Sequence, residues 1–159
     1  MKHVVFVAAA ALSLSACASS VLTVEKPYAG NQRYSSAQLI YDESSVTVDD
    51  NNLDYTKRKM QDALFGGESP IFTAGDGLTV RYRYVGFNEG SRVGRYLAPG
   101  IAGGSKIVLE ADFVDQSGNV MSTVRGEAEV GGGFAGGSNK TGIDKAVQEI
   151  AEYASAKFR

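Results

Sequence analysis

The residues best suited to general acid/base chemistry in this sequence are two pairs of carboxylates. Glu110 with Asp112, and Glu127 with Glu129, stand two positions apart in segments that alternate, so each pair shares one face of a strand. Hydrolases of the glycosidase type use two neighbouring carboxyl groups as their catalytic residues. A solvated strand face produces the same spacing routinely, so we keep a hydrolase that uses these carboxylates only as an alternative.

Cys17, the only cysteine, is placed for a different chemistry, which is acylation. Lys2, an apolar run over residues 4–14 and small residues before Cys17 have the layout of a secretory signal. The run falls short of the about 20 apolar residues that a membrane-spanning helix needs. Its ending, Leu-Ser-Ala-Cys, is similar to the lipobox of bacterial lipoproteins, whose cysteine receives a diacylglyceryl group and, after cleavage, a further acyl chain such as palmitate.

The predicted processing makes residues 1–16 a lipoprotein signal peptide and Cys17 the lipid-bearing first residue of the mature chain. Because Ala18, and not Asp, follows the cysteine, the resemblance favours sorting to the periplasmic face of the outer membrane. The single histidine, His3, is removed with the signal. Without a histidine or a free thiol, the mature chain has no Ser-His-Asp or Cys-His catalysis and no disulfide, and only carboxylates and other oxygen ligands remain for metal binding. We predict that it is not an enzyme and has no cofactor and no metal site.

Charge and length set the partners and the domain organisation. The net charge of the 159-residue chain is −2, without the basic excess that nucleic-acid binding requires, so nucleic acid is not an expected partner. Residues 17–37 mix Ser, Gly, Asn and Pro with little apolar periodicity, and we interpret them as a lipid-anchored tether. The remainder, residues 38–159, has the size of one periplasmic domain. For Tyr28, Tyr34 and Tyr41, the roles of interface anchor and domain-edge packing both stay open.

Periodicity predicts the elements of this domain. Strands with period two are expected over residues 78–84, 106–114 and 120–130, the last two forming a hairpin across a turn at 115–119, and one or two short strands are expected between 38 and 50. Helical spacing of apolar residues predicts helices over 53–65 and from 143 to 158. The predicted fold class is α+β, with a mainly antiparallel sheet of about four to six strands and two helices packed on one face.

Two glycine-rich segments, 86–105 and 131–138, are the best candidates for binding loops. The second resembles a phosphate-binding loop in its order of strand, glycines and Lys140, but its glycine spacing does not match that motif. Arg92, Arg95, Tyr96 and Phe134 are the candidate partner- or ligand-binding residues of these segments. Ordinary pairing with acidic residues across the sheet remains the favoured interpretation of arginines on strand faces.

The C-terminal half carries a family resemblance. The run GLTVRYRYVGFNEGSRVGRYLAPGIAGGSKIVLEADFVDQSGNVMSTVRGEAEVGGGFAGG, followed by GIDKAVQEIAEYASAKF, resembles the bacterial lipoproteins of the domain-of-unknown-function 4410 family. The likeness covers residues 77–158 and rests on Arg95 before a Gly-rich loop, the Gly118-Asn119 turn, a second Gly-rich loop and a final helix. It implies an envelope lipoprotein with a small α+β domain and carries over no catalytic residue.

These observations lead to three hypotheses of function. The first is an outer-membrane-anchored periplasmic lipoprotein that acts as a non-enzymatic binding or accessory module of an envelope complex, with assembly from several copies left open. The second is a binding module for a small amphiphile such as a lipid or glycolipid. The third is the envelope hydrolase that uses paired carboxylates.

Overall fold

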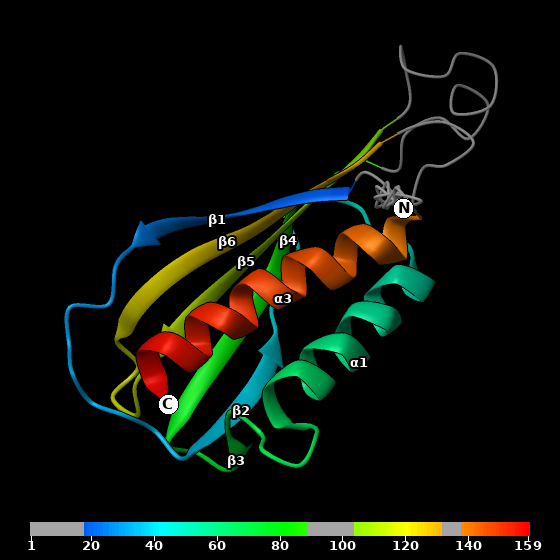
Figure 1. Cartoon of the computed structure of the whole chain (residues 1–159). Helices are drawn as coiled ribbons and strands as arrows, with labels where there is room; N and C mark the ends of the chain where they lie inside the picture. The colour runs from blue at the N-terminus through cyan, green and yellow to red at the C-terminus, as the bar shows by residue number, and fades with distance from the viewer. Residues whose placement is uncertain (1–17, 89–103, 132–137) are drawn as a thin grey trace, which may run out of the picture.

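Six strands form a single sheet, and two helices lie side by side across one of its faces (Figure 1). The structure is a computed structural model that describes residues 18–88, 104–131 and 138–159. In chain order its elements are β1 (Ala18–Lys26), β2 (Ser36–Tyr41), α1 (Asp50–Phe65), β3 (Thr73–Ala74), β4 (Leu78–Asn88), β5 (Ser105–Val114), β6 (Val120–Val130) and α3 (Asn139–Phe158).

The strand order across the sheet is β1-β6-β5-β4-β2-β3. Strands β1, β6, β5 and β4 are antiparallel neighbours, whereas β2 runs parallel to both β4 and β3. The predicted α+β class, with a mainly antiparallel sheet and two helices on one face, is confirmed. The predicted hairpin forms as β5 and β6. Parallel strands need a long crossover connection, and the segment that contains α1 supplies it between β2 and β4.

Helix α1 begins at Asp50, three residues before the predicted start at residue 53, and Asp49 caps it. The Asp49 carboxylate accepts a hydrogen bond from the Asn52 N–H at 3.1 Å, which satisfies one of the free amides of the first turn. The helix ends at Phe65, before Gly66 and Gly67. Only one strand, β2, forms between residues 38 and 50, and the alternation at Val46 and Val48 lies in the connection to α1.

Helix α3 buries the apolar stripe that its sequence predicts. Ile143, Ala146, Val147, Ile150, Ala151, Ala154 and Phe158 are all buried, and Tyr153 joins them. The helix approaches β6 closely at Gly126, where a Cβ atom would clash with the Ala146 carbonyl oxygen. Phe158 stacks on Phe113 of β5 with ring centroids 4.5 Å apart. This contact fixes the C-terminal end of α3 over the centre of the sheet.

The predicted tether over residues 17–37 is wrong in its first part, because residues 18–26 are strand β1. Ala18 pairs with Val130 and the pairing with β6 continues to Lys26, with a bulge between Val24 and Lys26. The alternation of Ser20, Leu22 and Val24 with the residues between them fits a strand. The pairing partner β6 lies far away in the sequence, so local composition gave no indication of it.

The chain after β1 is also held against the domain. Tyr34 is buried and its N–H donates to the Phe158 carbonyl at 2.7 Å, while the Tyr28 ring packs on the Phe158 ring at 4.5 Å. Tyr28 and Tyr34 therefore pack on the domain, at the C-terminal end of α3. Tyr41, by contrast, is 40% exposed at the end of β2.

Candidate functional site

The face of the sheet that carries no helix, which we call the outer face, is lined by charged side chains. Arg81 and Arg83 of β4 stand opposite Asp112 and Glu110 of β5, and Arg125 of β6 stands opposite Glu110 from the other side. Alternation along each strand places all five on the same face. For Arg81 and Arg83 the structure confirms the pairing with carboxylates across the sheet that the sequence predicts, and Arg125 adds a pair that was not predicted.

Glu110 and Asp112 are the centre of this charge network. Glu110 accepts from Arg125 Nε at 2.7 Å and from Arg83, while Asp112 accepts from Arg83 Nη1 at 3.2 Å and Arg81 Nη2 at 3.3 Å. The pKa of Arg125 is raised, chiefly by its hydrogen bond to Glu110. Each carboxylate residue is only 5% exposed although no helix covers it, because the arginine side chains lie over it.

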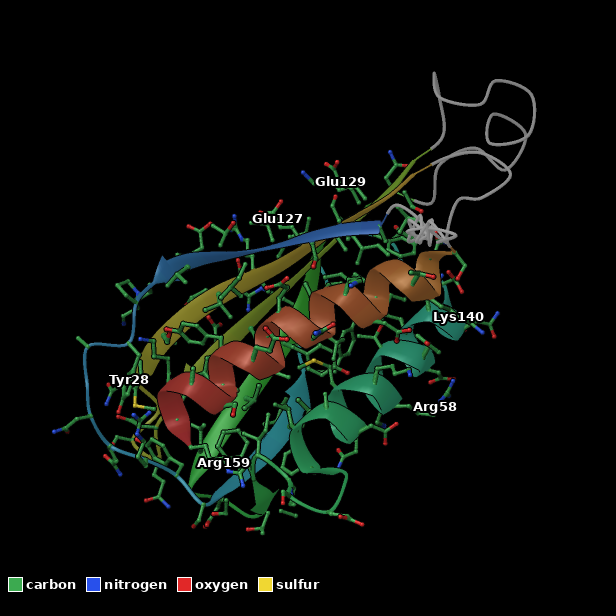
Figure 2. All side chains as sticks on the ribbon, viewed as in Figure 1. Tyr28, Arg58, Glu127, Glu129, Lys140 and Arg159 are labelled. Atoms are coloured by element: carbon green, nitrogen blue, oxygen red, sulfur yellow. The ribbon has the colours of Figure 1, made fainter. Side chains whose placement is uncertain are left out.

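Residues at the rim of the outer face extend the network in a more exposed form. Glu127 accepts from Thr23 Oγ1 of β1 at 3.1 Å and lies 3.4 Å from Lys106 Nζ. Figure 2 shows Glu127 and Glu129 pointing away from the helices, and the Glu129 side chain is 69% exposed. Exposed pairs of this kind contribute little to stability.

The two carboxylate pairs therefore differ in what they can do chemically. A substrate that reached Glu110 or Asp112 would have to displace an arginine, since the described part of the chain leaves both carboxylates covered. Glu127 and Glu129 are accessible but stand on an open face. Over residues 18–88, 104–131 and 138–159, no group of three or more His, Cys, Asp or Glu side chains is arranged to hold a metal ion.

The helix-covered side carries an open groove between α1 and α3. It has a volume of about 560 Å³ and a largely apolar floor that includes Ala63, Ile71, Val147 and Ala151. Asp144 stands at its margin, where it accepts a hydrogen bond from Tyr55 at 2.9 Å. This bond, after burial, contributes to the raised pKa of the Tyr55 hydroxyl. The groove is the feature that bears on amphiphile binding.

The exposed large apolar side chains of the described residues lie on two strands only. Val21 and Val24, 56% and 41% exposed, belong to β1, and Ile40 and Tyr41, 42% and 40% exposed, belong to β2. Strand β1 is one margin of the sheet, and β2 is covered at the other margin only by the two residues of β3. Apolar exposure is therefore concentrated at the two sides of the sheet.

A second hollow lies beside the β2 margin. Its volume is about 500 Å³, and it is lined by Leu39 and Tyr41 from β2 and by Leu53, Lys57 and Gln61 from α1, among others. Tyr82 closes it from β4, with its ring centroid 5.4 Å from that of Tyr41. Burial, together with the nearby Tyr41, raises the pKa of Tyr82 to about 12.

The site residues predicted from sequence, Cys17, Arg92, Arg95, Tyr96 and Phe134, lie outside the described residues. The ends of the segments that contain them are described, and they meet at one end of the sheet. Ala18 pairs with Val130, Val130 pairs with Ser105, and Lys106 pairs with Asn88. The residue after Cys17 and the strand ends that border both glycine-rich segments are thus neighbours (Figure 1).

Sequence reasoning missed the two margins of the sheet. Val21 and Val24 were assigned to the tether, and Ile40 was given no role. The alternation of Val21 and Thr23 with Leu22 and Val24 could have revealed the strand. Which strands lie outermost depends on the strand order, which no local signal encodes.

No helix among the described residues combines the length and apolar character needed to cross a membrane.

Comparisons with known proteins show a shared fold without a shared sequence. No protein-family model matches the chain, and no curated protein matches it. The solved structures similar to it include a single-substitution variant of PelC from Paraburkholderia phytofirmans, described as a dodecamer. The TM-score is 0.58 and the identity 11%, covering 90% of this chain and 99% of that one. A second PelC dodecamer from the same organism has a TM-score of 0.56 and 10% identity, covering 90% and 100%.

Proposed function

We propose that this chain is a lipid-anchored, non-enzymatic accessory module on the periplasmic face of the outer membrane, and that it works as an assembly of several copies within an envelope complex. The observation that carries the proposal is the position of β1. This strand is already formed at Ala18, the first described residue and the one that follows the candidate lipidation residue Cys17, and it forms an exposed margin of the sheet. The anchor and an apolar margin therefore belong to one continuous segment.

The shared fold supports assembly from several copies. The PelC structures, which align over almost their whole length with this chain, are dodecamers. In this chain, exposed apolar residues stand on β1 and β2 at opposite margins of the sheet, where they are available to neighbouring molecules. A sheet margin whose backbone groups are unpaired is a place where another chain can add a strand.

The outer-face charge network supports a non-enzymatic role. The arginines occupy both oxygens of Glu110 and leave the two buried carboxylates covered. A catalytic acid or base needs access to its substrate. The network instead ties β4, β5 and β6 together, so we assign it to the stability of the module.

The test compares three full-length chains in cells: the natural protein, Cys17→Ser, and the control Ser19→Ala, which changes an exposed neighbour. We expect the natural and control chains to incorporate labelled palmitate and to fractionate with the outer membrane, and Cys17→Ser to do neither. Amine-reactive crosslinking followed by mass spectrometry should recover peptides that link two copies of the chain, together with any envelope partner. A natural chain that takes up no palmitate, or one that yields only uncrosslinked monomer, would overturn the corresponding half of the proposal.

The α1–α3 groove favours amphiphile binding as a second candidate function. Its apolar floor could hold an acyl chain, although the groove is open along its length and not enclosed. Native mass spectrometry of the purified natural protein should then detect a bound lipid. Replacing Ala151 on the floor by Glu should remove that lipid, whereas replacing Gln148 at the rim by Glu should not.

A further inference from the structure

We infer that copies join margin to margin: β1 of one copy pairs, antiparallel, with the free part of β2 of the next, so that their sheets become continuous. The inference rests on the self-assembly proposed above and specifies the surface that mediates it. The partner is a second copy of this chain. The evidence is the hydrogen-bonding direction of the two margins, their polarity and their side chains.

The free part of β2 has backbone groups that nothing in the described structure pairs. Strand β3 covers only Ser36 and Ala37. Asp42 N–H donates to Tyr82 on β4, and Gly75 N–H donates to Ala37 on the opposite side. Because alternate residues of a strand direct their N–H and C=O groups to opposite sides, those of Leu39 and Tyr41 point outward, away from β4. They are ready to accept and donate hydrogen bonds to a further strand.

Strand β1 offers the complementary margin. Within the described residues it pairs only with β6, so one of its two sides is open along its length. Thr23 contacts Glu127 on the outer face, and Ser20 donates to Glu149 of α3 on the helix side. In a strand of known direction, the face on which a side chain stands determines whether the N–H and C=O groups of that residue point to the left or to the right neighbour. For β1, this places the N–H and C=O groups of Ser20 and Leu22 on the side away from β6.

Strand polarity decides how two copies can meet. The pairs β1–β6, β6–β5 and β5–β4 are antiparallel, and the pair β4–β2 is parallel. Three reversals of direction therefore separate β1 from β2, so these two strands run in opposite directions. A second copy in the same orientation therefore brings its β1 antiparallel to β2 of the first. This contact is heterologous, since different surfaces meet, and repeated contacts of this kind close into a ring or extend as a filament.

The side chains select one register. Placing Val21 opposite Ile40 brings together the most exposed apolar residues of each margin on the outer face. On the helix side the same register sets Leu22 opposite Leu39 and beside the hollow of about 500 Å³ between β2 and α1. The hollow thus receives side chains from the incoming strand, as in other cases of strand addition to a sheet edge.

Engineered cysteines test the contact directly in membranes. Cys17 is consumed by the lipid under the proposed function, so the natural chain offers no competing thiol. In the inferred register Val21 and Ile40 form a non-hydrogen-bonded pair, with Cα atoms about 4.5 Å apart, a separation that suits a disulfide. The chain that carries both Val21→Cys and Ile40→Cys should give a ladder of disulfide-linked multimers on a non-reducing gel.

The controls separate the alternatives. Val21→Cys alone and Ile40→Cys alone should stay monomeric, and Ile40→Cys combined with Ser117→Cys, at the tip of the β5–β6 hairpin, should give no ladder. Dimers from a single-cysteine variant would mean that like margins meet, and this outcome would overturn the heterologous contact. If amine-reactive crosslinking detects multimers and the Val21–Ile40 pair gives no ladder, the interface inferred here is wrong while the proposed assembly stands.

Charge substitutions give a second test that needs no new covalent bond. Val21→Lys or Ile40→Lys places a charge on an already exposed position, so the fold should persist, as circular dichroism can verify. Each should reduce the crosslinked multimer by about tenfold or more, the change that corresponds to 1.4 kcal/mol. Combining Val21→Lys with Ile40→Glu should restore multimers. Single variants that fold and assemble like the natural chain would contradict the contact.

Discussion

The two faces of the central strands bury their side chains by different means. On the helix side, Tyr82 and Phe113 are covered by α1 and α3 and surrounded by other apolar groups. On the outer face, Glu110 and Asp112 are almost as inaccessible, but what covers them is the set of arginine side chains that also neutralise them. The helix side is stabilised by buried apolar area, and the outer face is stabilised by charge pairing.

This difference predicts how each face responds to mutation and solvent. Apolar burial is insensitive to moderate salt and is lost when atoms are removed. Charge pairing weakens with salt, and removal of one partner leaves the other poorly compensated. The comparison can therefore be tested by substituting one face at a time.

The largest effect is expected on the helix side. Phe113→Ala removes a fully buried ring that stacks on Phe158 at an interplanar angle of 18°. We expect it to lower the free energy of unfolding by about 3–5 kcal/mol, with little dependence on salt. Urea denaturation at low and high salt measures both quantities. A loss below about 1 kcal/mol would mean that this face is not tightly packed.

Glu110→Gln should have the next largest effect, on the outer face. It leaves Arg83 and Arg125 without their shared carboxylate, and we expect a loss of about 1–3 kcal/mol that shrinks as salt is added. Glu129→Gln is the matched control, because among the described residues its exposed carboxylate pairs only with Lys106, at 3.8 Å. Equal effects of the two substitutions would show that covering by arginine does not strengthen the Glu110 contacts.

The dependence of stability on alkaline pH tests the burial of Tyr82 on the helix side. Burial raises its pKa to about 12, so folding favours the neutral hydroxyl. The corresponding stability is fully present below pH about 10, the usual tyrosine pKa, and is lost as pH rises toward 12. Tyr82→Phe should therefore lose less stability over this range than the natural chain. Identical slopes in unfolding measurements from pH 9 to pH 12 would contradict this account.

The smallest effect is expected at the hairpin turn, where neither face is involved. Hydrogen bonds from Asn119, and from the Ser117 and Gly118 amides, hold the pKa of Asp115 below its usual range. Its stabilising contribution is present above pH about 4 and is lost as pH falls through the lowered pKa of the folded state. Asp115→Ala should destabilise the protein near neutral pH and converge with the natural chain in acid.

Much of the fold was predictable because its signals are local. Period-two alternation identified β4, β5 and β6, and the spacing of apolar residues identified most of α1 and α3. Strand β1 was missed because its sequence is rich in serine and its pairing partner lies at the other end of the chain. Alternation also predicted that strand-face arginines pair with acidic residues across the sheet, whereas the particular pair Arg83–Glu110 depends on the register between β4 and β5.

The candidate contact surface was not predictable in this way. Val21 and Ile40 have ordinary strand sequences around them, and both would be less exposed if another strand lay outside β1 or β2. Their exposure arises from the order of strands, which depends on contacts across the whole chain. The predicted candidates Arg92, Arg95, Tyr96 and Phe134 stay predictions.

The start of β1 at Ala18 also bears on the entropy of assembly. With a lipid on Cys17, the strand would be attached to the bilayer with almost no slack, and every copy would diffuse in one plane with a similar orientation. Much of the translational and rotational freedom that association removes would then already be lost. A contact as short as residues 38–41 of β2, too small to hold two free proteins together in solution, would be sufficient under these conditions.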